Sequence, residues 1–217
     1  MDKKYDIIAF DLDGTLTDPA RGLIASFVYA LGKAGIDYGD KSTLHRFIGP
    51  PIYTEWQKVF GITPEHSTVA LNLFHEYYSV YGWWDNEMYG GVSQMLAELK
   101  KKGKKIILST SKPEHFAKKI LALFEIDKYF DFIGGAISDK ERDKKHEVLE
   151  YALNSVGATD RSRCILVGDR CYDAEGAKIC GIDSLGVLYG HGTADEIMAA
   201  GFTRVAKTVE EINKILE

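Results

Sequence analysis

Apolar residues in the first third of the chain follow a helical pattern. From about residue 21 to residue 81 they recur every three or four positions, as they do on one face of a helix. The clearest faces are formed by Ile24, Phe27, Val28 and Leu31, and by Val69, Leu73, Phe74 and Tyr77. Thr63 followed by Pro64 is typical of a helix start. With no strong strand pattern in it, this region is predicted to be helical.

From about residue 90 onward, short apolar runs alternate with helical patterns. The runs predict strands at residues 105–108, 130–133, 164–167 and 184–188, with a small one near 204–205. An isolated run at 7–10 predicts a first strand before the helical region. Helices are expected at 92–103 and at 143–156. Two more are expected, one that starts at residue 113 and one that follows residue 169 and ends at residue 181. Strands that alternate with helices favour an α/β fold, here a Rossmann-like parallel sheet wrapped by helices.

The order of these patterns predicts an interrupted domain. The first predicted strand is separated from the second by about 80 residues that look helical. We therefore expect a Rossmann-like core made of residues 1–19 and 88–217, with residues 20–87 inserted as an all-helical cap domain. Linkers near residues 18–19 and 85–88 would act as its hinges.

Composition narrows the function classes. The 217-residue chain is 45% hydrophobic and 27% charged, with a formal net charge of -5. An acidic chain argues against binding nucleic acid through broad electrostatics, but a few local cations can still bind small anions. No apolar run approaches a membrane span, and no signal peptide is recognisable. Three cysteines, an odd number, fit a reducing compartment, so a cytoplasmic location is expected.

The segment after the first predicted strand carries the strongest chemical signal. Asp11 and Asp13 lie two positions apart, followed by Gly14 and Thr15. At the carboxyl end of a parallel strand, such acids face the crevice in which open α/β sheets bind ligands. Carboxylates, a hydroxyl and a flexible backbone suit a hard cation such as Mg²⁺ beside a phosphate. Alternatives are a surface turn or a calcium-binding loop, although calcium-binding loops carry further acids at alternate positions, whereas here Leu16 follows Thr15.

Two later segments carry phosphate-binding residue types. Thr110 and Ser111 follow the strand at 105–108 and are expected at a helix N-terminus, where hydroxyls and N–H groups bind phosphate. Simple helix capping is the alternative. Lys144 and Lys145 open the helix at 143–156, and Lys145 is preferred because it precedes Leu149 by four positions. A solvated basic turn is the alternative there.

A fourth segment places two acids at the end of a strand. Asp169 follows the strand at 164–167 directly, as Asp11 follows the first strand, and Asp173 comes four positions later. We expect Asp169 to bind a metal. For Asp173, the alternative to a role in the site is to cap or stabilise the helix that begins there. Arg170 is expected to pair with Asp173 or to touch the edge of the metal site. His191 lies in a Gly-His-Gly sequence after a predicted strand, where a surface loop is expected and an approach to the crevice is the alternative.

In order, these four segments resemble the four motifs of the haloacid dehalogenase-like hydrolase superfamily. Residues 47–51, 168–173 and 186–190 are similar to its phosphoglycolate phosphatase and 5'-nucleotidase branch, whose members carry a helical cap between the first two motifs. The resemblance implies that Asp11 is the nucleophile and that Asp13 is the general acid and base. It implies Mg²⁺ binding by Asp11, by the Asp13 backbone carbonyl and by Asp169, with Asp173 in support.

The resemblance also assigns the remaining site residues. Phosphate binding falls to Gly14, Thr15, Thr110, Ser111 and Lys145. Arg46 and Gly49, in the predicted cap, would contribute to substrate specificity.

The resemblance implies a Mg²⁺-dependent phosphatase that hydrolyses small phosphate monoesters through an aspartyl-phosphate. Phosphoglycolate and nucleoside monophosphates are the expected kinds of substrate. A phosphomutase of the β-phosphoglucomutase type and a non-catalytic phosphate-sensing domain remain as alternatives. The expected partner is a small phosphorylated metabolite, with no nucleic acid or membrane, and the protein is expected to be a monomer or homodimer.

Overall fold

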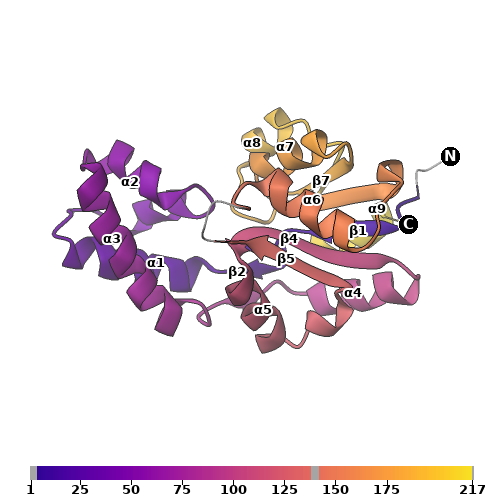
Figure 1. Cartoon of the computed structure of the whole chain (residues 1–217), viewed down its shortest axis with the longest axis horizontal. Helices are drawn as coiled ribbons and strands as arrows, with labels where there is room; N and C mark the ends of the chain where they lie inside the picture. Colours follow the sequence, from indigo (N-terminus) through magenta and orange to yellow (C-terminus); the bar gives the residue numbers. More distant parts are fainter. Residues whose placement is uncertain (1–3, 138–141, 217) are drawn as a thin grey trace. The chain divides into compact units, whose positions relative to one another are not determined.

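A computed structural model describes residues 4–137 and 142–216 (Figure 1). The chain forms two compact units, Met1–Asp18 with Met88–Glu217, and Pro19–Glu87. Two short strands, β2 (Thr17–Asp18) and β3 (Glu87–Met88), pair as a small sheet where the chain passes from one unit to the other. Among the described residues, no helix is both long and apolar enough to cross a membrane.

The larger unit is built on a six-stranded sheet in which the paired strands are parallel, with the order β5-β4-β1-β6-β7-β8. This confirms the predicted α/β class. The strands are β1 (Ile7–Phe10), β4 (Lys105–Pro113), β5 (Phe132–Ala136), β6 (Cys164–Gly168), β7 (Asp183–Val187) and β8 (Arg204–Ala206). Strand β5 begins two residues later than expected, because Asp127–Tyr129 form a 3₁₀ turn, η3, before it.

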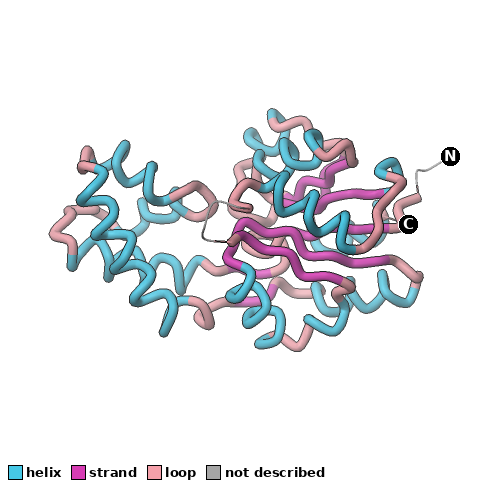
Figure 2. Tube along the Cα trace, viewed as in Figure 1, coloured by secondary structure: helices cyan, strands magenta, loops and turns pink. Residues whose placement is uncertain are grey.

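Helices cover both faces of this sheet (Figures 1 and 2). They are α4 (Val92–Lys101), α5 (Glu114–Leu123), α6 (Lys145–Ser155), α7 (Cys171–Ile179), α8 (Ala194–Ala199) and α9 (Val209–Ile215), with a further 3₁₀ turn, η4 (Arg161–Arg163). Side chains alternate along β1, so Ile7 and Ala9 pack in the same apolar cluster as Leu149 of α6 and Ala177 of α7. Helices α6 and α7 therefore fix the ends of the central strands.

Apart from Glu87, which begins β3, the regular structure of the smaller unit is helical. It contains α1 (Ala20–Lys33), the 3₁₀ helix η1 (Lys41–Phe47), α2 (Ile52–Phe60), α3 (Pro64–Tyr77) and the π-helix η2 (Tyr78–Gly82). The expected cap at Thr63 is present, since its side chain accepts a hydrogen bond from the His66 N–H. An aromatic core joins the helices: the Phe27 ring stacks on Phe74 at 5.5 Å and meets Trp56 edge-on at 5.9 Å.

Candidate active site

The candidate site begins at the ends of three neighbouring strands. Phe10, the last residue of β1, is in register with Leu108 of β4 on one side and with Val167 of β6 on the other. The Asp11 N–H continues the ladder by donating to the Val167 carbonyl at 2.9 Å. The residues that follow β1 and β6 therefore emerge together at the carboxyl edge, where open parallel sheets bind ligands.

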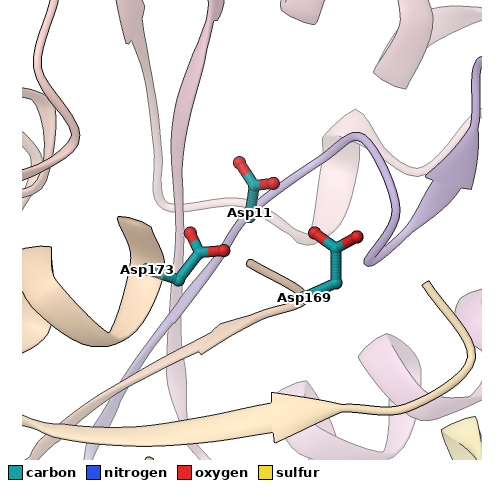
Figure 3. A group of neighbouring side chains, drawn as sticks. All are labelled: Asp11, Asp169 and Asp173. Atoms are coloured by element: carbon teal, nitrogen blue, oxygen red, sulfur yellow. The ribbon is translucent and has the colours of Figure 1, made fainter. Parts of the chain in front are cut away.

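Three buried carboxylates gather at this edge, those of Asp11, Asp169 and Asp173 (Figure 3). One oxygen from each lies within 4.8 Å of the others. Asp11 follows β1, Asp169 follows β6, and Asp173 lies in the first turn of α7. The structure thus brings together acids that are up to 162 positions apart, since 173 minus 11 is 162.

Lys145 supplies positive charge to this cluster. It is the first residue of α6, and its Nζ lies 2.6 Å from Asp11 Oδ1 and 2.6 Å from Asp173 Oδ1. Burial alone would lower the pKa of Lys145, but the charges of Asp11 and Asp173 outweigh burial and raise it. These two carboxylates are the anions that a lysine at a helix N-terminus requires. The exposed Lys144 has no such environment.

Lys145 does not neutralise the cluster fully, so a net negative charge is left. Three carboxylates and one ammonium group give a formal charge of -2. Burial, followed by the charges of Asp173 and Asp11, raises the pKa of Asp169 well above its usual range. Burial also raises the pKa of Asp173, although the Lys145 charge opposes the shift. Such raised values are expected of acids crowded together without a compensating cation.

Three glycine residues surround Asp169 closely with backbone that carries no side chains. Its Oδ2 accepts a hydrogen bond from the His191 N–H at 2.7 Å. A Cβ atom at Gly14 or at Gly190 would lie 2.0 Å or 2.5 Å from Asp169 Oδ2, and one at Gly192 would lie 2.0 Å from the Asp169 carbonyl oxygen. Gly14 also has a φ of 83°, which L side chains rarely adopt. These positions therefore require glycine for the Asp169 carboxylate to lie where it does.

The donor set fits a hard divalent cation. Asp169 Oδ1 is buried and has no hydrogen-bond partner among the described residues. A buried carboxylate oxygen in that state is costly unless something binds it. Clustered carboxylate oxygens are the ligands that Mg²⁺ and Ca²⁺ prefer, and a charge of +2 would balance the formal charge of the cluster. The group of side chains contains Asp11 and Asp169, as expected of a metal site, and also Asp173, for which a supporting role was expected.

Asp13 takes a separate partner. Strand β1 ends at Phe10 as expected, and Asp13 lies beyond it in an isolated bridge with Thr17. The Asp13 Oδ2 forms an ion pair with the Nζ of Lys112, a lysine to which the sequence patterns assigned no role. A signal was present in the sequence, because Lys112 directly follows Thr110 and Ser111.

The segment around Thr110 departs from the expected geometry. Strand β4 runs to Pro113 and α5 begins at Glu114, so Thr110 and Ser111 lie on a strand extension and not at a helix N-terminus. An irregularity in the pairing of β4 with β5 between Thr110 and Pro113 allows this extension. Thr110 is buried, whereas Ser111 is exposed. Thr15 is fully buried, and its hydroxyl has no hydrogen-bond partner among the described residues.

Arg170 and His191 both lie at the edge of the cluster, through contacts that the sequence patterns did not specify. The Arg170 side chain pairs with Glu196, Nε to Oε1 at 2.9 Å, and its backbone N–H donates to Asp173 Oδ2 at 3.0 Å. His191 is partly buried and takes part in the site through its N–H, although a surface loop was expected. The Gly-His-Gly sequence was the available signal, since flanking glycines permit close backbone approach.

Arg46 and Gly49 belong to the smaller unit. Arg46 is exposed in η1, where its Nε–H donates to the Thr43 carbonyl at 3.2 Å. Gly49 has a φ of 103° in the turn before α2. Their part in substrate specificity stays a prediction.

Comparison with known proteins gives the family. Residues 8–187 match the haloacid dehalogenase-like hydrolase family. The chain belongs to this family. It is 35% identical over 214 residues to a 5'-nucleotidase of Pseudomonas aeruginosa, covering 99% of this chain and 96% of that protein. A solved structure from Clostridium difficile, ascribed to a phosphatase, superposes with a TM-score of 0.91 at 41% identity and covers 99% of this chain and 100% of that one.

Some relatives of this haloacid dehalogenase-like hydrolase are named as kinases. The tyrosine-protein kinase PtkA of Mycobacterium tuberculosis is 36% identical over 212 residues, which cover 97% of this chain and 72% of that protein. Phosphatase names are borne by relatives that include a phosphoglycolate phosphatase of Colwellia psychrerythraea, 27% identical over 92% of this chain and 91% of that protein. The family and these relatives identify the chain as an enzyme, a phosphatase acting on phosphoric monoesters.

Proposed function

We propose that this enzyme hydrolyses small phosphate monoesters with Mg²⁺ and through an aspartyl-phosphate on Asp11. The observation that supports this most directly is the contact of Asp11 with Lys145 beside Asp169 and Asp173. A carboxylate that attacks a phosphate must approach another anion, and phosphoryl transfer depends mainly on positioning and charge compensation. Lys145 and a divalent cation would supply that compensation.

In the first step, an oxygen of Asp11 attacks the phosphorus atom and the bond from phosphorus to the ester oxygen breaks. Protonated Asp13 gives its proton to the departing oxygen, which leaves as an alcohol. Lys145 donates to Asp11 and to the phosphoryl oxygens. The Thr110 hydroxyl and the Ser111 N–H would hold the transferring group in line. The N–H groups of Gly14 and Thr15 donate instead to the carbonyls of Thr17 at 2.7 Å and Leu12 at 3.2 Å.

In the second step, Asp13 removes a proton from water, and the water oxygen attacks the phosphorus atom of the aspartyl-phosphate. The bond between phosphorus and the Asp11 oxygen breaks, which returns Asp11 as a carboxylate and releases inorganic phosphate. Asp13 therefore ends the cycle carrying the proton with which it began.

Asp11, Asp169 and the Asp13 backbone carbonyl would hold Mg²⁺, with Asp173 orienting Lys145. When bound, the cation neutralises charge on the phosphoryl oxygens. The unpaired Oδ1 of Asp169 and the formal charge of the three acids and Lys145 support its presence.

The substrate class rests on the relatives and on residues 20–87. A 5'-nucleotidase and a phosphoglycolate phosphatase are both among the similar proteins, so we propose nucleoside monophosphates and phosphoglycolate as the first substrates to test. Residues 20–87 would act as a cap, with Arg46 and Gly49 contributing to selection. The enzyme would work in the cytoplasm as a monomer or homodimer.

Phosphate release from a panel of monoesters tests this function. Wild-type protein, Asp11→Asn and the exposed control Asp127→Asn are assayed with Mg²⁺ and with excess chelator. We expect release that requires Mg²⁺, survives in Asp127→Asn and falls at least about 1,000-fold in Asp11→Asn, as for loss of a nucleophile. Undiminished release by Asp11→Asn would refute the mechanism.

The same panel tests other phosphoryl acceptors. Conversion of one sugar phosphate isomer into another, without phosphate release, would indicate a mutase. Transfer from ATP to a tyrosine-containing peptide would indicate the activity that the name of PtkA describes. Binding without turnover of any substrate would indicate a phosphate sensor.

A further inference from the structure

Lys112 is a second buried lysine of the site, with a partner different from that of Lys145. Its side chain is 5% exposed, and its Nζ pairs with Asp13 Oδ2, while the Asp13 side chain is 24% exposed. An ammonium group at that depth is costly to bury unless a carboxylate or similar group compensates it. The pairing with Asp13 thus accounts for a charge inside the protein that the chemistry of Asp11 does not use.

The backbone delivers Lys112 to this place through the irregular end of β4. Pairing with β5 is regular at Thr110 and resumes out of step at Pro113. Within this stretch Ser111 is exposed and Lys112 is buried. The Lys112 N–H also donates to the Thr110 hydroxyl at 3.3 Å. The same local distortion therefore fixes both the predicted phosphate-binding threonine and the lysine.

The two oxygens of Asp13 are in different situations. Oδ2 receives the Lys112 ammonium group. Oδ1 is buried and has no hydrogen-bond partner among the described residues. A general acid must present one oxygen to the reacting group while the rest of its carboxyl group is held still. The difference between the two oxygens meets that need.

We propose that Lys112 is a positioning residue that holds Asp13 by Oδ2, so that Oδ1 gives the proton to the leaving oxygen and takes one from water. This inference rests on the proposed phosphatase mechanism. In this arrangement Lys112 acts on the reaction through Asp13. Its loss should therefore matter most for substrates whose leaving group needs the proton.

Leaving-group chemistry gives a readout that a merely structural role would not change. The leaving oxygen of ethyl phosphate requires a proton, whereas the leaving group of p-nitrophenyl phosphate departs as a stable phenolate. For Lys112→Met, we expect kcat/KM to fall at least about tenfold more with ethyl phosphate than with p-nitrophenyl phosphate. The matched control is Lys118→Met, which removes an exposed lysine of α5 and should leave both values unchanged.

A double-mutant cycle with Asp13→Ala makes the test specific. If Lys112 acts through Asp13, Lys112→Met should add almost nothing to the loss of ethyl phosphate hydrolysis in the Asp13→Ala protein. Lys112→Arg keeps a cation and should recover part of the ethyl phosphate activity. It also keeps the proposal testable if the methionine variant does not fold, which thermal unfolding would reveal.

Three outcomes would overturn the proposal. Equal loss with both esters would mean that Lys112 supports the fold, and unchanged kinetics would mean that the pair has no catalytic role. A rise in KM confined to carboxylate-bearing esters such as phosphoglycolate would make Lys112 a substrate-binding group. Absence of hydrolysis by the wild-type protein would instead refute the phosphatase mechanism itself, so the two failures can be told apart.

Discussion

Asp11 and Lys145 lie 134 positions apart in the chain, yet their side chains meet at 2.6 Å in the interior. Asp11 leaves the central strand β1, and Lys145 opens the helix that packs over it. The contact therefore ties the two segments of the larger unit that the helical region separates in sequence. Charge neutralisation at Asp11 depends on the docking of α6 onto the sheet.

Replacing Lys145 with methionine should affect both stability and catalysis. The substitution leaves Asp11 and Asp173 buried without their ammonium partner, and breaking a buried ion pair from one side costs about 3–5 kcal/mol. We expect the free energy of unfolding to fall by about 3 kcal/mol without metal, and phosphate release to fall steeply. Lys144→Met, at the exposed neighbouring position, should change neither value. Chemical denaturation measures the free energy of unfolding, and an activity assay measures phosphate release. Equal losses in Lys145→Met and Lys144→Met would contradict the role assigned to Lys145.

Stability of the metal-free protein should depend on pH through Asp169. Its pKa is raised in the folded state by burial and by the charges of Asp173 and Asp11, so the folded protein binds a proton that the unfolded chain releases at about pH 4. The Asp169 contribution therefore opposes folding increasingly as pH rises above that value and up to the raised pKa. We expect the free energy of unfolding of the wild-type protein, measured in chelator, to fall relative to that of Asp169→Asn as the pH rises from about 5 to 7. Parallel curves for the two proteins would contradict the assignment.

Mg²⁺ should stabilise the wild-type protein and not Asp169→Asn. A ligand that binds only the folded state raises its stability by mass action. The asparagine keeps an oxygen that can accept the His191 N–H but removes a charge from the cluster. We expect the unfolding temperature of wild type to rise with Mg²⁺ concentration, and that of the variant to stay nearly constant. A matched increase in both would place the metal elsewhere.

Gly14→Ala should damage the site more than an equally strained control. A left-handed backbone costs an alanine about 1–2 kcal/mol. Gly14 and Gly103 have φ values of 83° and 76°, but only at Gly14 would the new methyl group lie 2.0 Å from Asp169 Oδ2. Gly103→Ala should lose only that backbone cost and keep its response to Mg²⁺. Gly14→Ala should lose more stability and most of the response, as a Mg²⁺ titration followed by thermal unfolding would show.

Local sequence patterns were sufficient for the parts of the fold that depend on short-range physics. The run at 7–10 and the helical face that includes Leu149 mark their elements, because burial on a sheet or helix imposes a period. Asp11 and Asp169 could be singled out because each directly follows a buried strand. The registers of β1 with β4 and β6 then place them together.

The remaining features depend on contacts between distant segments. Nothing in the local pattern shows that β4 continues to Pro113, since the irregular pairing with β5 produces that extension. Lys112 was missed for the same reason, because its burial follows from this distortion. His191 takes part through a backbone N–H, which side-chain chemistry does not reveal. Arg170 pairs with Glu196, 26 positions away.

The bare backbone around Asp169 has one more consequence. Since Gly14, Gly190 and Gly192 already lack side chains, single substitutions there can fill the space but cannot enlarge it. The backbone paths of the two loops that carry these glycines therefore set the dimensions of the space around Asp169. A variant library aimed at larger substrates should therefore leave these three positions fixed and vary side chains farther from Asp169.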